Sequence, residues 1–176
     1  MIDKERYIYW SEGDKDTLNQ EVVWRELYSR FGYIFHVVQM LEYNIANIIA
    51  IEKFKKRANK PLSKERFINI KKRIAEEFEK LSKQTFGELK DKVKKSEFLK
   101  EIDYNELSEI VEYRNYLAHN CYKEKLLKNE LRTIESVDSF VEELNNYECR
   151  IRELNDLVVK ILESHKLKTI IFTKNN

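Results

Sequence analysis

Apolar residues recur at alternating spacings of three and four along two long stretches of the chain. The first stretch runs from Trp24 to about Lys56, before Asn59-Lys60-Pro61, and the second begins after Ser136. This spacing places apolar side chains on one face of an α-helix. The first face comprises Leu27, Phe31, Ile34, Val38, Leu41, Ile45 and Ile48, and the second comprises Val137, Phe140, Leu144, Tyr147, Ile151, Leu154, Val158 and Ile161. We expect two long amphipathic helices that form the spine of a bundle.

Three further helices are predicted between the two long ones. A basic helix starts after Ser63 and a short helix starts after Thr85, because serine and threonine are favoured N-cap residues. A third helix spans Glu106 to about Leu127, with a break near His119-Asn120. The basic helix has Phe67, Ile70, Ile74, Phe78 and Leu81 on one side. The expected total is about five helices, with room for a sixth near the N-terminus and a short extended segment at residues 169–173.

The composition supports an all-α protein built as one domain over residues 1–176. Only three glycines and one proline are present, which leaves little turn chemistry for a β-protein, and no repeat or linker marks a second domain. The two cysteines, Cys121 and Cys149, lie outside any CxxC pattern, so neither a zinc site nor a cofactor is expected.

The most apolar segment, residues 31–51, is expected to be a core helix. His36, Gln39, Glu42, Asn44 and Asn47 interrupt it, and a central carboxylate alone costs about 2.5–3.5 kcal/mol in a bilayer. The N-terminus shows no pattern of a secretion signal. We therefore expect a cytoplasmic protein that does not span a membrane.

Charge is distributed unevenly along the chain. Residues 53–100 carry 17 Lys and Arg against 7 Asp and Glu, whereas residues 101–165 carry 8 against 15. A basic region of this size is compatible with binding to nucleic acid phosphates. It is equally compatible with a pair of solvated surface helices.

The string Glu112-Tyr113-Arg114-Asn115-Tyr116-Leu117-Ala118-His119-Asn120 contains the most informative polar residues. In a helix, Arg114 falls within the apolar stripe formed by Leu107, Ile110, Val111, Leu117 and Ala118. A buried, unpaired arginine is costly, so its guanidinium needs a partner, a water-filled cleft or an interface. Any of these makes a functional site more probable at this position.

Arg114, Asn115 and His119 are suited to metal-free cleavage of RNA, in which the ribose 2′-hydroxyl attacks the adjacent phosphate. Arg114 would clamp the phosphate oxygens, and His119 would take or give a proton at cellular pH. Asn115 would orient the imidazole or a substrate oxygen. Arg114 and His119 diverge by about 140° on an ideal helix, so a helix end or a π-bulge near His119 is needed to bring them together.

Arg-Asn-Tyr-Leu-Ala-His at residues 114–119 resembles the Arg-x4-His signature of the HEPN superfamily, including the polar residue after the arginine. The order of a long first helix, a basic middle, a late motif helix and a long final helix is also similar, as is the stretch Thr85-Phe86-Gly87-Glu88-Leu89. The resemblance covers about residues 17–165. In one toxin branch a tyrosine stands two residues after the histidine, where this chain has Cys121 followed by Tyr122.

This resemblance implies an up-and-down HEPN-like bundle that acts as a metal-independent endoribonuclease, often a toxin or an antiphage-defence effector. It implies a homodimer with two motif helices facing a composite cleft, and a possible antitoxin or defence-system partner. The residues that it assigns to catalysis are Arg114, Asn115 and His119.

RNA contacts are expected from Tyr116, Tyr122 and Lys123, because tyrosine rings can stack on bases and lysine binds phosphates. The other two histidines have structural interpretations. His36 lies beside the apolar stripe of the first long helix and is expected to be a core residue, and His165 is expected at the end of the last helix.

Two alternatives to catalysis remain open at this level. Some HEPN domains are inactive, so the chain could be an RNA-binding or complex-assembly module. It could also be a purely structural helical partner, in which Arg114 forms an ion pair with a glutamate such as Glu42 or Glu109 and His119 caps or packs a helix.

Overall fold

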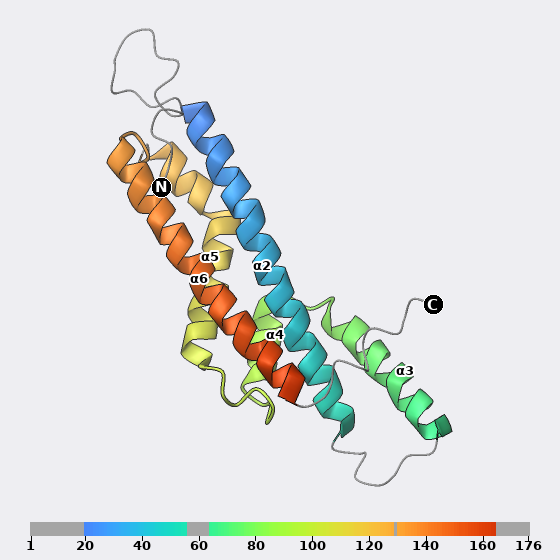
Figure 1. Ribbon diagram of the computed structural model, residues 1–176. Helices are drawn as coiled ribbons and strands as arrows, with labels where there is room; N and C mark the ends of the chain where they lie inside the picture. The colour runs from blue at the N-terminus through green and yellow to red at the C-terminus, as the bar shows by residue number, and fades with distance from the viewer. Residues whose placement is uncertain (1–19, 56–63, 129, 165–176) are drawn as a thin grey trace. The chain divides into compact units, whose positions relative to one another are not determined.

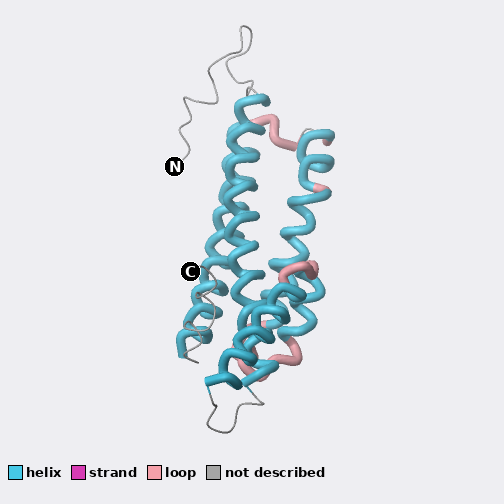
Figure 2. The backbone as a smooth tube through the Cα atoms, turned by 90° about the vertical axis from the view of Figure 1, so that its right-hand side faces the viewer, coloured by secondary structure: helices cyan, strands magenta, loops and turns pink. Residues whose placement is uncertain are grey.

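The computed structural model describes residues 20–55, 64–128 and 130–164 (Figure 1). The α-helices are α2 (Gln20–Lys55), α3 (Lys64–Leu81), α4 (Phe86–Val93), α5 (Tyr104–His119) and α6 (Ile134–Ser164), and a π-helix, η1, spans Tyr122–Leu126. Helices account for 85% of the described residues, and no strand occurs among them (Figure 2). The all-α prediction is therefore confirmed. The predicted extra helix near the N-terminus, the extended segment at 169–173 and His165 lie outside the described residues.

The chain divides into two compact units, each assembled from two separate segments. Unit 1 comprises Met1–Val38 and Glu112–Ile151, and unit 2 comprises Gln39–Val111 and Arg152–Asn176. The long helices α2 and α6 and the motif helix α5 each contribute residues to both units. The predicted single domain is neither confirmed nor contradicted by this division.

Unit 1 is held together by apolar contacts between the first part of α2 and the first part of α6. The rings of Phe31 and Phe140 meet edge to face, with their centroids 6.3 Å apart. Arg30 Nη1 donates a hydrogen bond of 2.9 Å to Asn145 Oδ1 beside this contact. The predicted apolar faces of the two long helices therefore pack against each other in this unit. Apolar residues at alternating spacings of three and four form the stripe through which two helices pack.

Unit 2 contains α3 and α4 together with the second part of α2. Figure 1 shows α3 alongside this part of α2, where the Tyr43 and Phe78 rings lie 4.8 Å apart. Asn44 Nδ2 on α2 donates a hydrogen bond of 2.8 Å to Asn155 Oδ1 on α6. The buried apolar residues of this unit include Leu41, Ile45, Ile48, Leu89, Leu99, Leu107 and Ile110.

Local hydrogen bonds set the starts of two helices. Thr85 and Glu88 form a complete capping box at the start of α4, as the threonine predicted. The predicted start of the last helix is wrong, because α6 begins at Ile134 rather than after Ser136. Thr133 and Ser136 bond reciprocally, each backbone N–H donating to the other's side-chain oxygen at 3.2 Å. Thr133 is therefore the cap, and Ser136 lies inside the first turn.

Two predictions about single side chains are also wrong. His36 is exposed rather than buried in the core, because Ile34, Val37 and Val38 occupy the buried face of α2 at this level. Phe67 was expected on the apolar side of α3 but is 42% exposed. Its ring is covered in part by the Lys71 ammonium, whose Nζ lies 4.8 Å from the ring centroid.

Within the described residues, one helix is long and apolar enough to cross a membrane by length and composition alone. This helix is α2, over Glu21–Phe54, and 56% of its most apolar window is buried inside the protein. A core helix of a soluble protein meets the same criterion. The burial of Leu41, Ile45 and Ile48 is what a core helix requires.

Candidate functional site

The motif lies at the point where regular α-helix gives way to a wider turn. Helix α5 ends at His119, Asn120 forms a turn, and η1 begins at Tyr122. The predicted break near His119-Asn120 is confirmed, and a π-helix follows it. Arg114 and His119 both lie within regular α5, so neither irregularity lies between them to bring their side chains together. π-Turns inside helical segments often occur at functional sites, because they redirect side chains that a regular helix would align.

Arg114 is half-buried, and its contacts among the described residues are with Asn115 and Phe35. Its Nη1 donates a hydrogen bond of 3.1 Å to Asn115 Oδ1, and its Cζ lies 6.0 Å from the centroid of the Phe35 ring. Its Nε is buried without a hydrogen-bond partner. Arg114 forms no ion pair with a carboxylate in the described ranges, and the alternative of a structural ion pair with a glutamate, at an interface with a second chain, stays a prediction.

His119 is exposed and is the last residue of α5. Asn115 was expected to orient either this imidazole or a substrate oxygen, but its Oδ1 accepts from Arg114 instead. The structure thus joins Arg114 to Asn115, while His119 makes no hydrogen bond through its side chain to the residues described.

The two tyrosines on α5 are engaged in packing. Tyr113 donates a hydrogen bond of 2.5 Å to Glu143 Oε1, and its ring lies 4.6 Å from that of Tyr147. Burial, followed by the bond to Glu143, raises the pKa of Tyr113. Tyr116 is half-buried, and burial raises its pKa as well. Both phenols therefore stay neutral at cellular pH, and Tyr116 presents less surface for RNA than its position in the motif suggested.

Cys121 occupies the position where one toxin branch carries a tyrosine, and its side chain is buried. Burial raises the pKa of this thiol to about 11, although Lys125 and a hydrogen bond with Tyr116 act in the opposite direction. Both cysteines are free. Among the described residues, no three or more histidine, cysteine or acidic side chains lie together in a way that could hold a metal ion.

Three aromatic rings from α2 and η1 form a cluster just beyond the motif. The Trp24 ring lies 5.7 Å from that of Tyr28 and 5.3 Å from that of Tyr122, and the Tyr28 and Tyr122 rings are 6.5 Å apart and nearly parallel, at 19°. Trp24 is 6% exposed, whereas Tyr28 and Tyr122 are 51% and 50% exposed. Two half-exposed tyrosine rings thus lie beside a buried tryptophan.

Sequence reasoning identified Tyr122 but missed Trp24 and Tyr28. The available signal was the i, i+4 spacing of two aromatic residues with Tyr28 outside the apolar stripe of α2. The indole Nε1 of Trp24 is buried without a hydrogen-bond partner. Lys123, also predicted as an RNA contact, is exposed on η1 next to Tyr122.

Comparisons with known proteins were made at the level of families, single sequences and folds. No protein-family model, no curated protein and no solved structure matches this chain. The arguments below rest on the residues and contacts of the site.

Proposed function

We propose that the protein is a metal-independent endoribonuclease of the HEPN type, with Arg114 as the phosphate clamp and His119 as the proton-transfer group. The observation that carries the proposal is the state of Arg114, which is half-buried, held by Asn115 and free of any described carboxylate. A guanidinium in this state has N–H groups left to bind an anion. Arginine binds the two oxygens of a phosphate in a fork geometry that lysine lacks.

The proposed reaction is transesterification of the RNA backbone. The 2′-oxygen bonds to phosphorus, the bond between phosphorus and the 5′-oxygen breaks, and the products are a 2′,3′-cyclic phosphate and a 5′-hydroxyl. His119 accepts the proton from the 2′-hydroxyl or donates one to the leaving oxygen, a role typically worth about 10²–10⁴ in rate. Arg114 stabilises the charge that develops on the phosphate oxygens.

The exposed aromatic cluster supports binding of a single-stranded RNA. Tyr28 on α2 and Tyr122, which follows His119 by three residues, are each about half exposed, and Lys123 adds a positive charge next to Tyr122. Stacking of a base on an aromatic ring is worth about 1–3 kcal/mol and tolerates any base. Tyr122 and Lys123 would therefore hold the RNA while leaving the choice of sequence to other contacts.

The need for two proton-transfer groups favours a homodimer. The motif supplies one histidine, whereas cleavage needs one group to remove a proton and another to supply one. A two-fold axis that pairs two copies of α5 would bring a second His119 into the same cleft. A toxin or defence role in the cytoplasm, with an antitoxin or defence-system partner, forms part of the same proposal.

The test is cleavage of a mixed RNA substrate in EDTA by the wild type, Arg114→Ala and His119→Ala. Arg25→Ala is the matched control, because Arg25 is an exposed arginine on α2. We expect cleavage by the wild type and the control, cyclic phosphate ends on the products, and loss of cleavage in both motif variants. A substrate with 2′-deoxyribose at every position should resist cleavage. Equal cleavage by all four proteins would reveal a contaminant and overturn the proposal.

A second candidate function is a catalytically silent HEPN-type module for RNA binding or complex assembly. It is favoured by the imidazole of His119, which no described side chain orients, whereas a catalytic base is ordinarily held by a third group. RNA binding that weakens in Arg114→Ala, together with no cleavage by any protein, would select this function.

A further inference from the structure

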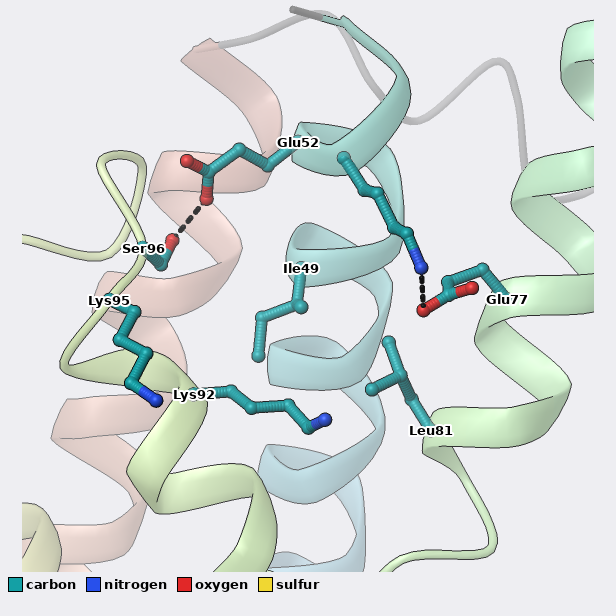
Figure 3. A pocket seen from close by; sticks show the side chains of 8 residues that line it. Ile49, Glu52, Glu77, Leu81, Lys92, Lys95 and Ser96 are labelled. Carbon is teal, nitrogen blue, oxygen red and sulfur yellow. Dashed lines mark hydrogen bonds and ion pairs between the residues drawn. The ribbon is translucent and has the colours of Figure 1, made fainter.

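Unit 2 contains a pocket of about 300 Å³ that belongs to no part of the motif site (Figure 3). It is bounded by Ile49 and Glu52 on α2, Leu81 at the end of α3, and Lys92 and the residues that follow α4. A volume of this size is at the lower end of the range for small-molecule sites, which is about 300–1,000 Å³. The pocket therefore suits a compact ligand rather than a dinucleotide cofactor.

Two acidic side chains line the pocket, and both are already engaged. Glu77 lies 2.6 Å from the Lys53 ammonium, which links α2 to α3 at the rim. Glu52 is 6% exposed and accepts hydrogen bonds from the Ser96 hydroxyl and, at 3.0 Å, from the Glu97 backbone N–H. Glu77 is thus neutralised by Lys53, whereas the hydrogen bonds to Glu52 come from neutral donors and leave its negative charge on the α2 side of the pocket.

Lys92 and Lys95 form no close ion pair with a carboxylate among the described residues, although the charge of Lys92, after the hydrogen bonds from Thr85, helps to lower the pKa of Glu88 one turn earlier. The turn after α4 is tight, with hydrogen bonds of 3.0 Å from Lys95 N to Lys92 O and from Ser96 N to Val93 O. Such i, i+3 bonding brings side chains three apart to the same side of the backbone. Figure 3 shows Lys92 running beneath Ile49 toward Leu81, with Lys95 beside it. Two ammonium groups that form no close ion pair among the described residues thus line one side of the pocket.

The remaining wall is apolar. Leu81 is buried and Ile49 is half-buried, and both line the pocket that Lys92 enters. A ligand that fits must combine an anionic group with a compact apolar or ring-shaped body. A phosphate monoester carries about −1.5 to −2 at pH 7, which Lys92 and Lys95 match when the phosphate lies on their side of the pocket, away from Glu52. A larger polyphosphate would exceed that charge and approach the carboxylate of Glu52.

We propose that this pocket is a binding site for a small phosphate monoester of nucleotide size, held by Lys92 and Lys95 with its body against Ile49 and Leu81. The site is separate from the motif in unit 1 and does not depend on ribonuclease activity. The proposal assigns a specific ligand to the basic region, residues 53–100, in place of a general attraction to nucleic acid phosphates.

The probe is adenosine 5′-monophosphate, with adenosine and inorganic phosphate as partial ligands, measured by isothermal titration calorimetry. The variants are Lys92→Gln and Lys95→Gln. Lys94→Gln is the matched control, because Lys94 lies on the same turn but contacts the Tyr104 ring, at 5.1 Å, and does not line the pocket. Circular dichroism confirms that each variant is folded.

We expect the monophosphate to bind more tightly than either partial ligand, and about tenfold more weakly to each pocket variant, as loss of one charge-assisted contact implies. Lys94→Gln should bind within about twofold of the wild type, because Lys94 does not line the pocket. The proposal is overturned by no binding of the monophosphate, or by equal weakening in Lys94→Gln. The second result would mean that the lysines act only as cations near the end of α4.

Discussion

Replacing Arg114 by methionine separates a binding arginine from a structural one. Methionine keeps an unbranched apolar stem in the half-buried position but removes the charge and every N–H donor. Arg114 makes one hydrogen bond, to the exposed Asn115, and lies over the Phe35 ring, while its buried Nε has no hydrogen-bond partner. The substitution therefore removes two weakly stabilising contacts, with Asn115 and Phe35, and one destabilising feature, the buried Nε that has no hydrogen-bond partner among the described residues.

The expected change in the free energy of unfolding is small. Loss of the hydrogen bond costs about 0.5–1.5 kcal/mol, and loss of the ring contact costs about 0.5–1 kcal/mol. Removal of the unsatisfied Nε returns about 1–3 kcal/mol. The terms nearly cancel, so Arg114→Met should lie within about 1.5 kcal/mol of the wild type. RNA cleavage should nevertheless fall by about 10²–10³, the usual effect of losing one donor to a developing negative charge.

The assay is urea unfolding followed by far-ultraviolet circular dichroism and by tryptophan fluorescence, because Trp24 reports on unit 1. Arg25→Met is the control for loss of an exposed arginine charge. Breaking a buried ion pair would cost about 3–5 kcal/mol. A loss of that size in Arg114→Met, with the slope against urea unchanged, would refute the reasoning, since Arg114 would then have a partner on which stability depends.

Three further predictions follow from single contacts. Tyr122→Ala should weaken binding of a labelled single-stranded RNA about 5- to 100-fold, as measured by fluorescence anisotropy. Tyr122→Phe should bind as the wild type does, because stacking on a base needs only the ring. Equal loss of binding in both variants would show that the hydroxyl, and not the ring, makes the contact. The hydrogen bonds from Thr85 lower the pKa of Glu88 in the folded protein, so Glu88→Gln should reduce the melting temperature at neutral pH. Well below pH 4.5, the ordinary pKa of this carboxyl, the wild type has lost the same charge and the substitution should have no effect. A difference in melting temperature that persists in acid would contradict this prediction. The exposed Cys149 should react rapidly with Ellman's reagent. Cys121 should react only in denaturant, because it is buried and its pKa is raised to about 11. Rapid reaction of both thiols in the native protein would show that η1 opens readily.

Helix positions were predictable from sequence because their signals are local. The apolar spacing of three and four located α2 and α3, and Thr85 marked the start of α4, since a cap acts only on the next few residues. The start of α6 was misplaced because two hydroxyl residues compete for the cap. Thr133 and Ser136 each bond to the other's backbone N–H, and only the three-dimensional bonding identifies the outer one.

Side-chain environments at the site were less predictable because they depend on distant segments. Arg114 was correctly expected to be partly buried, but its contact with Phe35 comes from another helix and could not be read from α5. Tyr28 was missed for the same reason, since its value as a stacking surface depends on Tyr122, which lies far along the chain. His36 was misassigned because helical spacing shows toward which side of α2 a side chain points, but not how wide the buried face of the helix is.

The discontinuous make-up of unit 1 has a consequence for the order of events during synthesis. Its two segments are separated by the whole of Gln39–Val111, and the hydrogen bond between Arg30 and Asn145 joins residues 115 positions apart. Contacts of such high sequence separation form late and slow the search for the native state. Translation proceeds from the N-terminus at about 5–20 residues per second, so Phe35 leaves the ribosome well before the arginine that it contacts. A truncated product that stops before Glu112 lacks Arg114 and His119 altogether, so the candidate site can exist only on a chain whose synthesis has passed His119.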